Sequence, residues 1–272
     1  MIPVLTSLAG TCLTSQNWQD VGINTAAFYL DTLLMKPGFD LLNNLSDLSS
    51  YVSWQNNLVL NATLPKINSD GIYKIHSHYD GSSISYTEDE IIKLIAKLKP
   101  NIVIMPNGIS EKNITLCNDL LSNIMIFLPA NDLLNSLDKS YGVYLTYDDK
   151  KSFQELLQEI EQYKNLPCYV AGNLNLQLMQ ELQRHNVKYI ESNLAALDAY
   201  NGKVYSSNKD IEIFDPKYAM EFEPIDESCV CPTCSQKLTK AYLHHLYANT
   251  PLLCQRFLIE HNIHFCQKNL TP

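Results

Sequence analysis

Between residues 87 and 191, apolar strand-like segments alternate with amphipathic helical segments. Thr87 and the three acids that follow it can cap a helix over 88–98, where Ile and Leu recur at helical spacing until Pro100 ends the pattern. Asn101 to Met105 then forms an apolar run that is typical of a buried parallel strand. The alternation continues and predicts strands near 124–128, 142–146, 168–172 and 188–190, separated by helices near 113–121, 131–137, 152–163 and 174–185.

This alternation indicates right-handed crossovers and a parallel sheet. The pattern alone does not decide between an open sheet and a closed barrel. Before residue 87 the pattern is weaker and predicts strands near 3–6, 25–29, 58–60 and 71–75. After residue 200, Asn201-Gly202 is typical of a hairpin turn, and 203–205 and 211–214 are predicted to pair antiparallel. Two helices, near 236–249 and 252–262, end the chain.

Composition narrows the class of protein. The chain has 272 residues, 46% hydrophobic and 18% charged, which suits one globular unit. It contains no apolar stretch long enough to cross a membrane, and its first residues lack a secretory signal, so we expect a cytoplasmic protein without a membrane partner. Twenty basic residues against 29 acidic ones give a net charge of −9, which argues against a large nucleic-acid footprint.

Eight cysteines are present, and three of them, Cys229, Cys231 and Cys234, lie within six residues. This spacing favours a zinc site over a disulfide framework, and a closed site with four protein ligands is structural because no position is left for a substrate. A Cys3His site is the sharpest prediction. Spacing does not decide which of the four histidines on the following helices is the fourth ligand; they are His244, His245, His261 and His264.

The residues Cys229-x-Cys231-x-x-Cys234, followed by Lys240-Ala-Tyr-Leu-His-His-Leu and by His261-Asn-Ile-His-Phe, resemble the zinc-binding end of the tRNA-guanine transglycosylases, also called queuine tRNA-ribosyltransferases. The resemblance implies that His261 is the fourth zinc ligand. It also implies an irregular (β/α)8 TIM-like barrel over residues 1–228, with a zinc-binding module and terminal helices over 229–272 in the same structural unit.

Enzymes of this family exchange a guanine in the tRNA anticodon for a 7-deazaguanine, and a carboxylate attacks the ribose C1′. The resemblance places the nucleophile at Glu191, the proton-transfer residue at Asn61 and the base-reading residue at Asn107. The family has an aspartate at each of these positions. An amide cannot carry a proton at neutral pH, and a glutamate moves the attacking oxygen by one methylene. Two arginines that would face tRNA phosphate fall on Leu197 and Tyr200.

Three hypotheses follow. In the first, the chain is a catalytically degenerate, zinc-binding partner subunit in queuosine modification of tRNA, similar to the non-catalytic eukaryotic subunit that has a glutamate at the nucleophile position. It then forms a homodimer, or a heterodimer with an active transglycosylase. In the second, it is an active but diverged pentosyltransferase that uses Glu191. In the third, it is a zinc-stabilised module that binds tRNA weakly through Lys237, Lys240 and Arg256.

Overall fold

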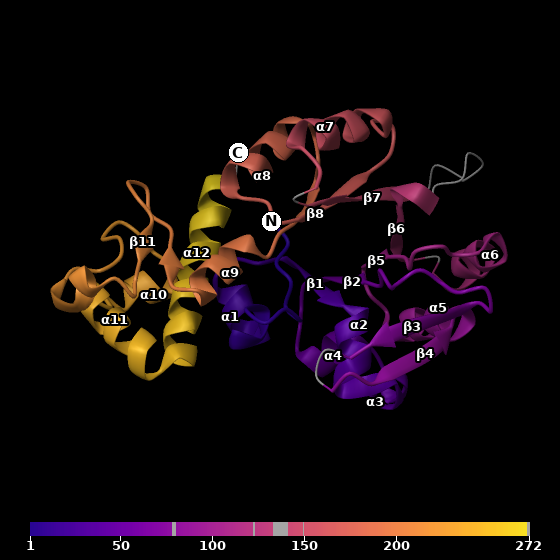
Figure 1. Ribbon diagram of the computed structural model, residues 1–272, viewed down its shortest axis with the longest axis horizontal. Helices are drawn as coiled ribbons and strands as arrows, with labels where there is room; N and C mark the ends of the chain where they lie inside the picture. Colours follow the sequence, from indigo (N-terminus) through magenta and orange to yellow (C-terminus); the bar gives the residue numbers. More distant parts are fainter. Residues whose placement is uncertain (78–79, 122, 133–140, 149, 271–272) are drawn as a thin grey trace.

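A seven-stranded parallel sheet curves into a barrel at the centre of the computed structural model (Figure 1). The structure describes residues 1–77, 80–121, 123–132, 141–148 and 150–270. Neighbouring strands in this sheet follow the order of the chain. In spatial order the strands are β1 (Thr25–Tyr29), β2 (Asn57–Asn61), β5 (Ile102–Ile104), β6 (Met125–Pro129), β7 (Gly142–Tyr147), β8 (Cys168–Gly172) and β9 (Tyr189–Glu191).

The N-terminal segment closes this barrel. Ile2 forms a parallel bridge with Glu191 at the end of β9, and Val4 forms one with Ala27 in β1. The Ile2 amide donates to the carbonyl of Ile190 over 2.7 Å. The strand predicted over 3–6 is therefore a pair of bridges that occupies the eighth strand position. The TIM-like barrel that the resemblance implied is confirmed.

Helices cover the outside of the barrel, and each predicted helix that lies in the described residues is present. Two of them begin with a capping box, in which Thr87 and Glu90, or Ser152 and Glu155, satisfy each other's backbone amides. The helices of the barrel are α1 (Ser15–Asp20), α2 (Leu30–Leu33), α3 (Phe39–Asn44), α4 (Leu48–Val52), α5 (Glu88–Leu98), α6 (Glu111–Leu120), α7 (Phe153–Gln162), α8 (Leu176–Arg184) and α9 (Leu194–Tyr200). Short turns of other helix types are η1 (Gly10–Cys12), η2 (Leu34–Gly38), η3 (Ala130–Asp132) and η4 (Pro216–Met220).

The structure corrects two local predictions. Asn201-Gly202 does not form a hairpin turn: Asn201 caps the C-terminus of α9, and Gly202 has a φ of +89°, a conformation that favours glycine. The antiparallel pair itself is confirmed as β10 (Lys203–Val204) and β11 (Ile211–Glu212). Strand β3 (Ile72–His76) pairs with a strand that the pattern did not predict, β4 (Ser83–Thr87), whose residues are all at least partly exposed. Of the helix predicted over 131–137, η3 is seen and 133–137 lie outside the described residues.

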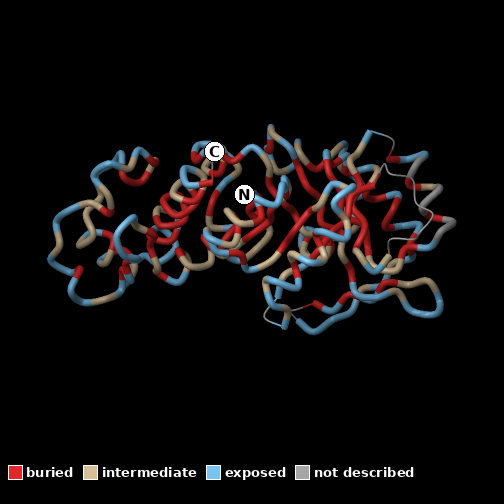
Figure 2. Tube along the Cα trace, turned by 90° about the horizontal axis from the view of Figure 1, so that it is seen from above, coloured by how far each residue is buried: buried red, intermediate tan, exposed pale blue. Residues whose placement is uncertain are grey.

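Aromatic side chains occupy the barrel interior, where one cluster of buried hydrophobic residues lies. Figure 2 shows that the buried residues run along the middle of the molecule. Phe127 makes edge contacts with Tyr169 and Tyr189, at centroid distances of 5.3 Å and 5.2 Å. A Cβ at Gly142 would lie 2.3 Å from the Phe127 ring, so glycine makes room for that ring. The other core lies between the barrel and its helices.

A C-terminal module follows η4 and consists of α10 (Pro232–Ser235), α11 (Lys240–Asn249) and the long helix α12 (Pro251–Leu270). Helix α12 packs on α9 and α8 of the barrel and also contacts α10 and α11 (Figure 1). It therefore fixes the cysteine-bearing turn to the barrel. None of the helices in the described part of the chain combines the length and the apolar character that a membrane span needs.

Candidate functional site

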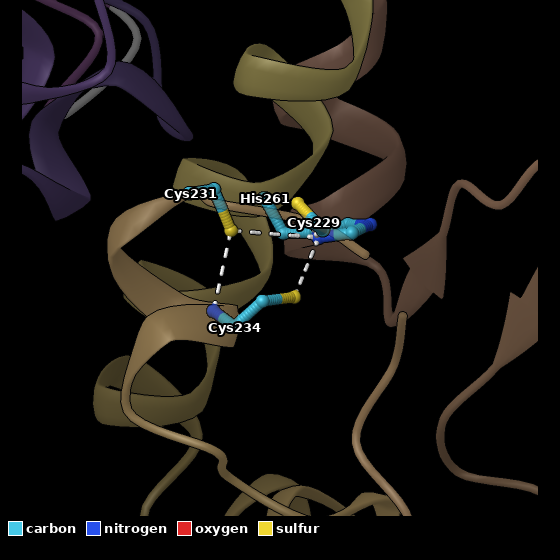
Figure 3. Close-up of side chains that lie close together, drawn as sticks. All are labelled: Cys229, Cys231, Cys234 and His261. Carbon is cyan, nitrogen blue, oxygen red and sulfur yellow. Dashed lines mark hydrogen bonds between the residues drawn. The ribbon is translucent and has the colours of Figure 1, made fainter. Parts of the chain in front are cut away.

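The three clustered cysteines and His261 point toward one another in the C-terminal module (Figure 3). Cys231 is the N-cap of α10 and Cys234 lies within that helix, so one short turn directs both sulfurs to the same point. His261 comes from the middle of α12, on the opposite side. The ligand atoms of all four residues lie within 4.8 Å of one another.

The geometry fits a tetrahedral metal ion. The Nδ1 atom of His261 lies 3.8, 3.6 and 3.3 Å from the sulfurs of Cys229, Cys231 and Cys234. Typical zinc–sulfur and zinc–nitrogen bonds in a tetrahedron place sulfur and nitrogen about 3.6 Å apart. Cys231, Cys234 and His261 are buried, and Cys229 is partly exposed. The predicted Cys3His ligand set, with His261 as the histidine, is therefore a group that can hold a metal ion.

The protonation states of this group also suit a cation. A hydrogen bond with Cys234 lowers the pKa of the Cys231 thiol to about 4, whereas the pKa of Cys234 is raised by the same bond. Burial lowers the pKa of His261, but hydrogen bonds with Cys229 and Cys231 raise it more, to about 10. Without a metal, the four groups must share protons at short distance, and a divalent cation takes the place of those protons.

Hydrogen bonds outside the cluster orient its histidine. The Nε2 atom of His261 donates to the carbonyl of Tyr205 over 2.8 Å, which leaves the Nδ1 lone pair directed at the cysteines. The next residue, Asn262, is fully buried; it accepts from the Tyr205 amide and donates to the carbonyls of Lys203 and Ala195. The His-Asn pair thus serves two purposes, because the imidazole faces the metal site and the amide ties α12 to the barrel.

The other histidines lie outside the cluster. His244 interacts with the carbonyl of Ile213, and His245 with Asn249 on its own helix. His264 is not among the clustered groups either. From spacing alone, each of these histidines was a candidate for the fourth metal ligand. The position of α12 places His261, and none of the other three, beside the cysteines.

Glu191, the proposed nucleophile position, lies at the end of β9 inside the barrel and is 2% exposed. Its two carboxylate oxygens accept hydrogen bonds from the hydroxyls of Tyr29, over 2.5 Å, and Tyr169, over 2.7 Å. Burial raises the pKa of Glu191, although the hydrogen bonds from the two tyrosines and the nearby amide of Asn61 act in the opposite direction. The carboxyl group of Glu191 is therefore enclosed by side chains of the barrel strands.

Asn61, at the end of β2, is also buried and faces this carboxyl group. Its Oδ1 atom accepts from the amide and hydroxyl of Thr63. Its Nδ2 atom has no partner within hydrogen-bond distance among the described residues. Tyr144, from β7, completes the group, and its pKa is raised by burial and by Glu191. Glu191 and Asn61, which the resemblance named as site positions, therefore lie close together in the structure. The resemblance did not predict the tyrosines around them.

The tyrosines could be identified only in part from the sequence. Tyr29, Tyr144 and Tyr169 lie in segments that were predicted as strands, and strand alternation decides which residues face inward. Which tyrosine reaches Glu191 depends on the register between strands. That register places Tyr29 beside Asn61 and Ala171 beside Glu191, at the same level of the barrel.

Asn107, the proposed base-reading position, lies just after β5, and its amide donates to the carbonyl of Leu64 over 2.7 Å. It lines a cavity of about 380 Å³ at the C-terminal ends of β6 and β7, together with Tyr144 and Thr146. Glu191 and Asn61 do not line this cavity. The structure thus separates the base-reading position from the buried carboxyl group, with Tyr144 between the two.

Residues 141–271 match a family model described as queuine tRNA-ribosyltransferase. The chain is also similar over nearly its whole length to curated proteins of that name. The relative in Clostridium perfringens strain SM101 is 22% identical, over 94% of this chain and 81% of the relative. The relative in Treponema denticola is 21% identical over 97% and 82%, and that in a Thermoanaerobacter species is 20% identical over 98% and 83%.

Proposed function

Because residues 141–271 match the model of the queuine tRNA-ribosyltransferase family, and the chain is similar over nearly its whole length to proteins of that name, we propose that it is a catalytically inactive, zinc-binding partner subunit in queuosine modification of tRNA. In this proposal the Cys3His group holds a structural zinc ion, and the protein works in the cytoplasm. It associates with an active transglycosylase or with a second copy of itself.

The enclosure of Glu191 carries the proposal. A nucleophilic carboxylate must be ionised and must reach the ribose C1′ of its substrate. Burial raises the pKa of Glu191, which favours the protonated and poorly nucleophilic form, and two tyrosine hydroxyls occupy its oxygens. The buried amide of Asn61 stands where a proton acceptor is needed, and an amide has no such capacity.

The surface of the C-terminal module supports the association. Large apolar side chains are exposed between residues 214 and 253, among them Met220 at 74%, Phe222 at 69% and Val230 at 76%. Exposed apolar residues that gather in one region are typical of an interaction surface. The full set in this region is Phe214, Met220, Phe222, Val230, Tyr242, Leu252 and Leu253.

Direct tRNA binding by this module has less support. Lys240 pairs with Glu221 over 3.0 Å, and Arg256 pairs with the buried Glu260 over 3.2 Å. Two of the three basic side chains that the third hypothesis needs are therefore already neutralised. We do not include a tRNA footprint of this module in the proposal.

Sedimentation velocity tests the association. The purified chain is measured alone and mixed with the active queuine tRNA-ribosyltransferase of its own organism. We expect a dimer in at least one of the two samples, and Phe222→Glu should weaken it at least tenfold because it places a charge in an apolar interface. Leu8→Glu, at an exposed apolar position far from the module in sequence, is the matched control. A monomer in both samples at micromolar concentration refutes the partner role.

One observation favours the second hypothesis, an active but diverged enzyme. The cavity beside Asn107 and Tyr144 lies at the C-terminal end of the strands, where TIM barrels place their active sites. If Glu191 attacks a substrate that enters through this cavity, the chain alone releases labelled base from tRNA, and Glu191→Gln abolishes the release. Equal signals from parent and variant exclude this hypothesis.

A further inference from the structure

A second cavity lies at the opposite, N-terminal end of the barrel. It has a volume of about 460 Å³ and opens where β6, β8 and β9 begin, at Met125, Cys168 and Tyr189. The ends of α7 and α8 form its sides. It shares no residue with the metal site or with the Glu191 network, so its role is independent of the function proposed above.

The inner wall of this cavity is apolar. Ile160 and Val187 are buried there, and the Tyr189 ring and Met125 are partly buried. Tyr189 also packs in the barrel core, where its ring stacks on Tyr169 at a centroid distance of 6.0 Å. The wall is therefore held by the barrel itself. Its volume falls in the range of sites that bind small organic molecules.

The rim of the same cavity is cationic. Lys164, Arg184 and Lys188 line it beside the imidazole of His185, with Glu161 as the one lining acid. The chain as a whole has 29 acidic residues against 20 Lys and Arg, so this concentration of basic side chains runs against its overall charge. A local positive potential inside a concave surface attracts anions.

These cations are available to a ligand. Lys164 pairs with Glu161 and Arg184 with Glu181, but both Lys164 and Arg184 are mostly exposed, and exposed ion pairs contribute little free energy. Lys188 makes no ion pair with any described residue. An anion that enters the cavity therefore displaces only weak contacts.

Stabilisation of helix ends by cations explains the presence of only some of the basic residues at this rim. Arg184 is the last residue of α8, where a cation interacts favourably with the helix dipole. Lys188 lies four residues further on, directly before β9, so the dipole does not account for it. The Tyr189 hydroxyl also has a weak partner: within the described chain it contacts the Met125 sulfur at 3.2 Å, and a thioether is a poor acceptor.

We infer that this cavity binds a small organic anion, whose apolar body packs on Tyr189 and whose charged group lies between Arg184 and Lys188. The apolar wall excludes inorganic anions as preferred ligands, and the cationic rim excludes neutral ones. A phosphate or carboxylate carried on an aromatic or aliphatic body satisfies both parts, and the Tyr189 hydroxyl can donate to its oxygen.

Calorimetric titration of the full chain with 1-naphthyl phosphate tests this inference. We expect one saturable site with a submillimolar Kd, and at least tenfold weaker binding of inorganic phosphate and of 1-naphthol, which each supply half of the recognition. Arg184→Gln combined with Lys188→Gln should weaken binding about tenfold, and added salt should weaken it as well. Tyr189→Phe, which keeps the ring, should cause a smaller loss.

The matched control removes two exposed lysines elsewhere, Lys93→Gln with Lys97→Gln on α5, and should leave the Kd unchanged. Equal melting temperatures of the two double variants and the parent establish that folding is unaffected. Absence of saturable binding at millimolar 1-naphthyl phosphate overturns the inference. It is also overturned if inorganic phosphate or 1-naphthol binds equally well, or if the control pair weakens binding as much as Arg184 with Lys188.

Discussion

Glu191 accepts hydrogen bonds from Tyr29 and Tyr169 in the buried interior of the barrel. At the scale of single residues, the side chain that we propose to stand at the family's nucleophile position is part of the core. A carboxyl group in such surroundings is most stable when protonated, since burial penalises the charged form. Its contribution to folding must then depend on pH.

This dependence has a definite sign. The pKa of Glu191 is raised in the folded state, so the stability that it contributes is complete below its ordinary value of 4.5 and is lost as the pH rises through the folded-state pKa. We expect the free energy of unfolding of Glu191→Gln, relative to the parent, to increase between pH 5 and pH 8. Glu191→Ala should lose about 3 kcal/mol, because it leaves a cavity and two buried hydroxyls without their acceptor. Urea denaturation across this pH range measures both effects, and parallel pH profiles of parent and Glu191→Gln would contradict the account.

At the scale of elements, helix α12 connects the Cys3His group to the barrel. His261 faces the cysteines, and Asn262, one residue later, joins α12 to β10 and α9. A metal ion held by the Cys3His group would join the α10 turn to α12, in addition to the hydrogen bond from Thr233 to the carbonyl of Phe257.

Asn262→Ala tests this connection. The substitution removes three hydrogen bonds of a fully buried amide and should lower the free energy of unfolding by about 3 kcal/mol. Asn269→Ala removes an exposed amide that bonds within the same helix and should change stability by less than about 0.5 kcal/mol. Chemical denaturation of both variants gives the comparison, and equal losses would show that Asn262 does not anchor α12.

Removal of the metal tests the module as a unit. A chelator should lower the melting temperature of the parent by about 10 °C or more, because four buried or partly buried ligands then face one another without a cation. Cys234→Ser should show the lowered value without chelator, whereas Cys12→Ser, outside the cluster, should behave like the parent. Elemental analysis of the purified protein should find one zinc ion per chain. Metal-free protein with an unchanged melting temperature would exclude a structural ion.

The sequence predicted elements best where local signals agree. Helix α5 has a capping box, an apolar face and a terminating proline, and it forms where predicted. Strand β4 was missed although Ile84 and Tyr86 alternate with Ser83 and Ser85, because this segment is short and its order depends on pairing with β3. The Asn201-Gly202 turn was assigned wrongly because the same dipeptide also suits the end of a helix. The tyrosines around Glu191 depend on strand register, which a single sequence does not encode locally.

At the scale of the whole molecule, three regions have separate roles. The C-terminal end of the barrel encloses Glu191 and Asn61. The C-terminal module keeps the Cys3His group and presents apolar side chains. The N-terminal end of the barrel holds a cationic cavity that neither of the other two regions uses. Such a division is consistent with a protein that acts through contacts with a partner.

The most direct test of the central claim is the exchange of labelled guanine into unmodified tRNA by the purified, zinc-loaded chain alone. Our account predicts no incorporation above the protein-free background for the parent and for Glu191→Gln. Incorporation by the parent that Glu191→Gln abolishes would show that Glu191 is a working nucleophile, and the account would be wrong.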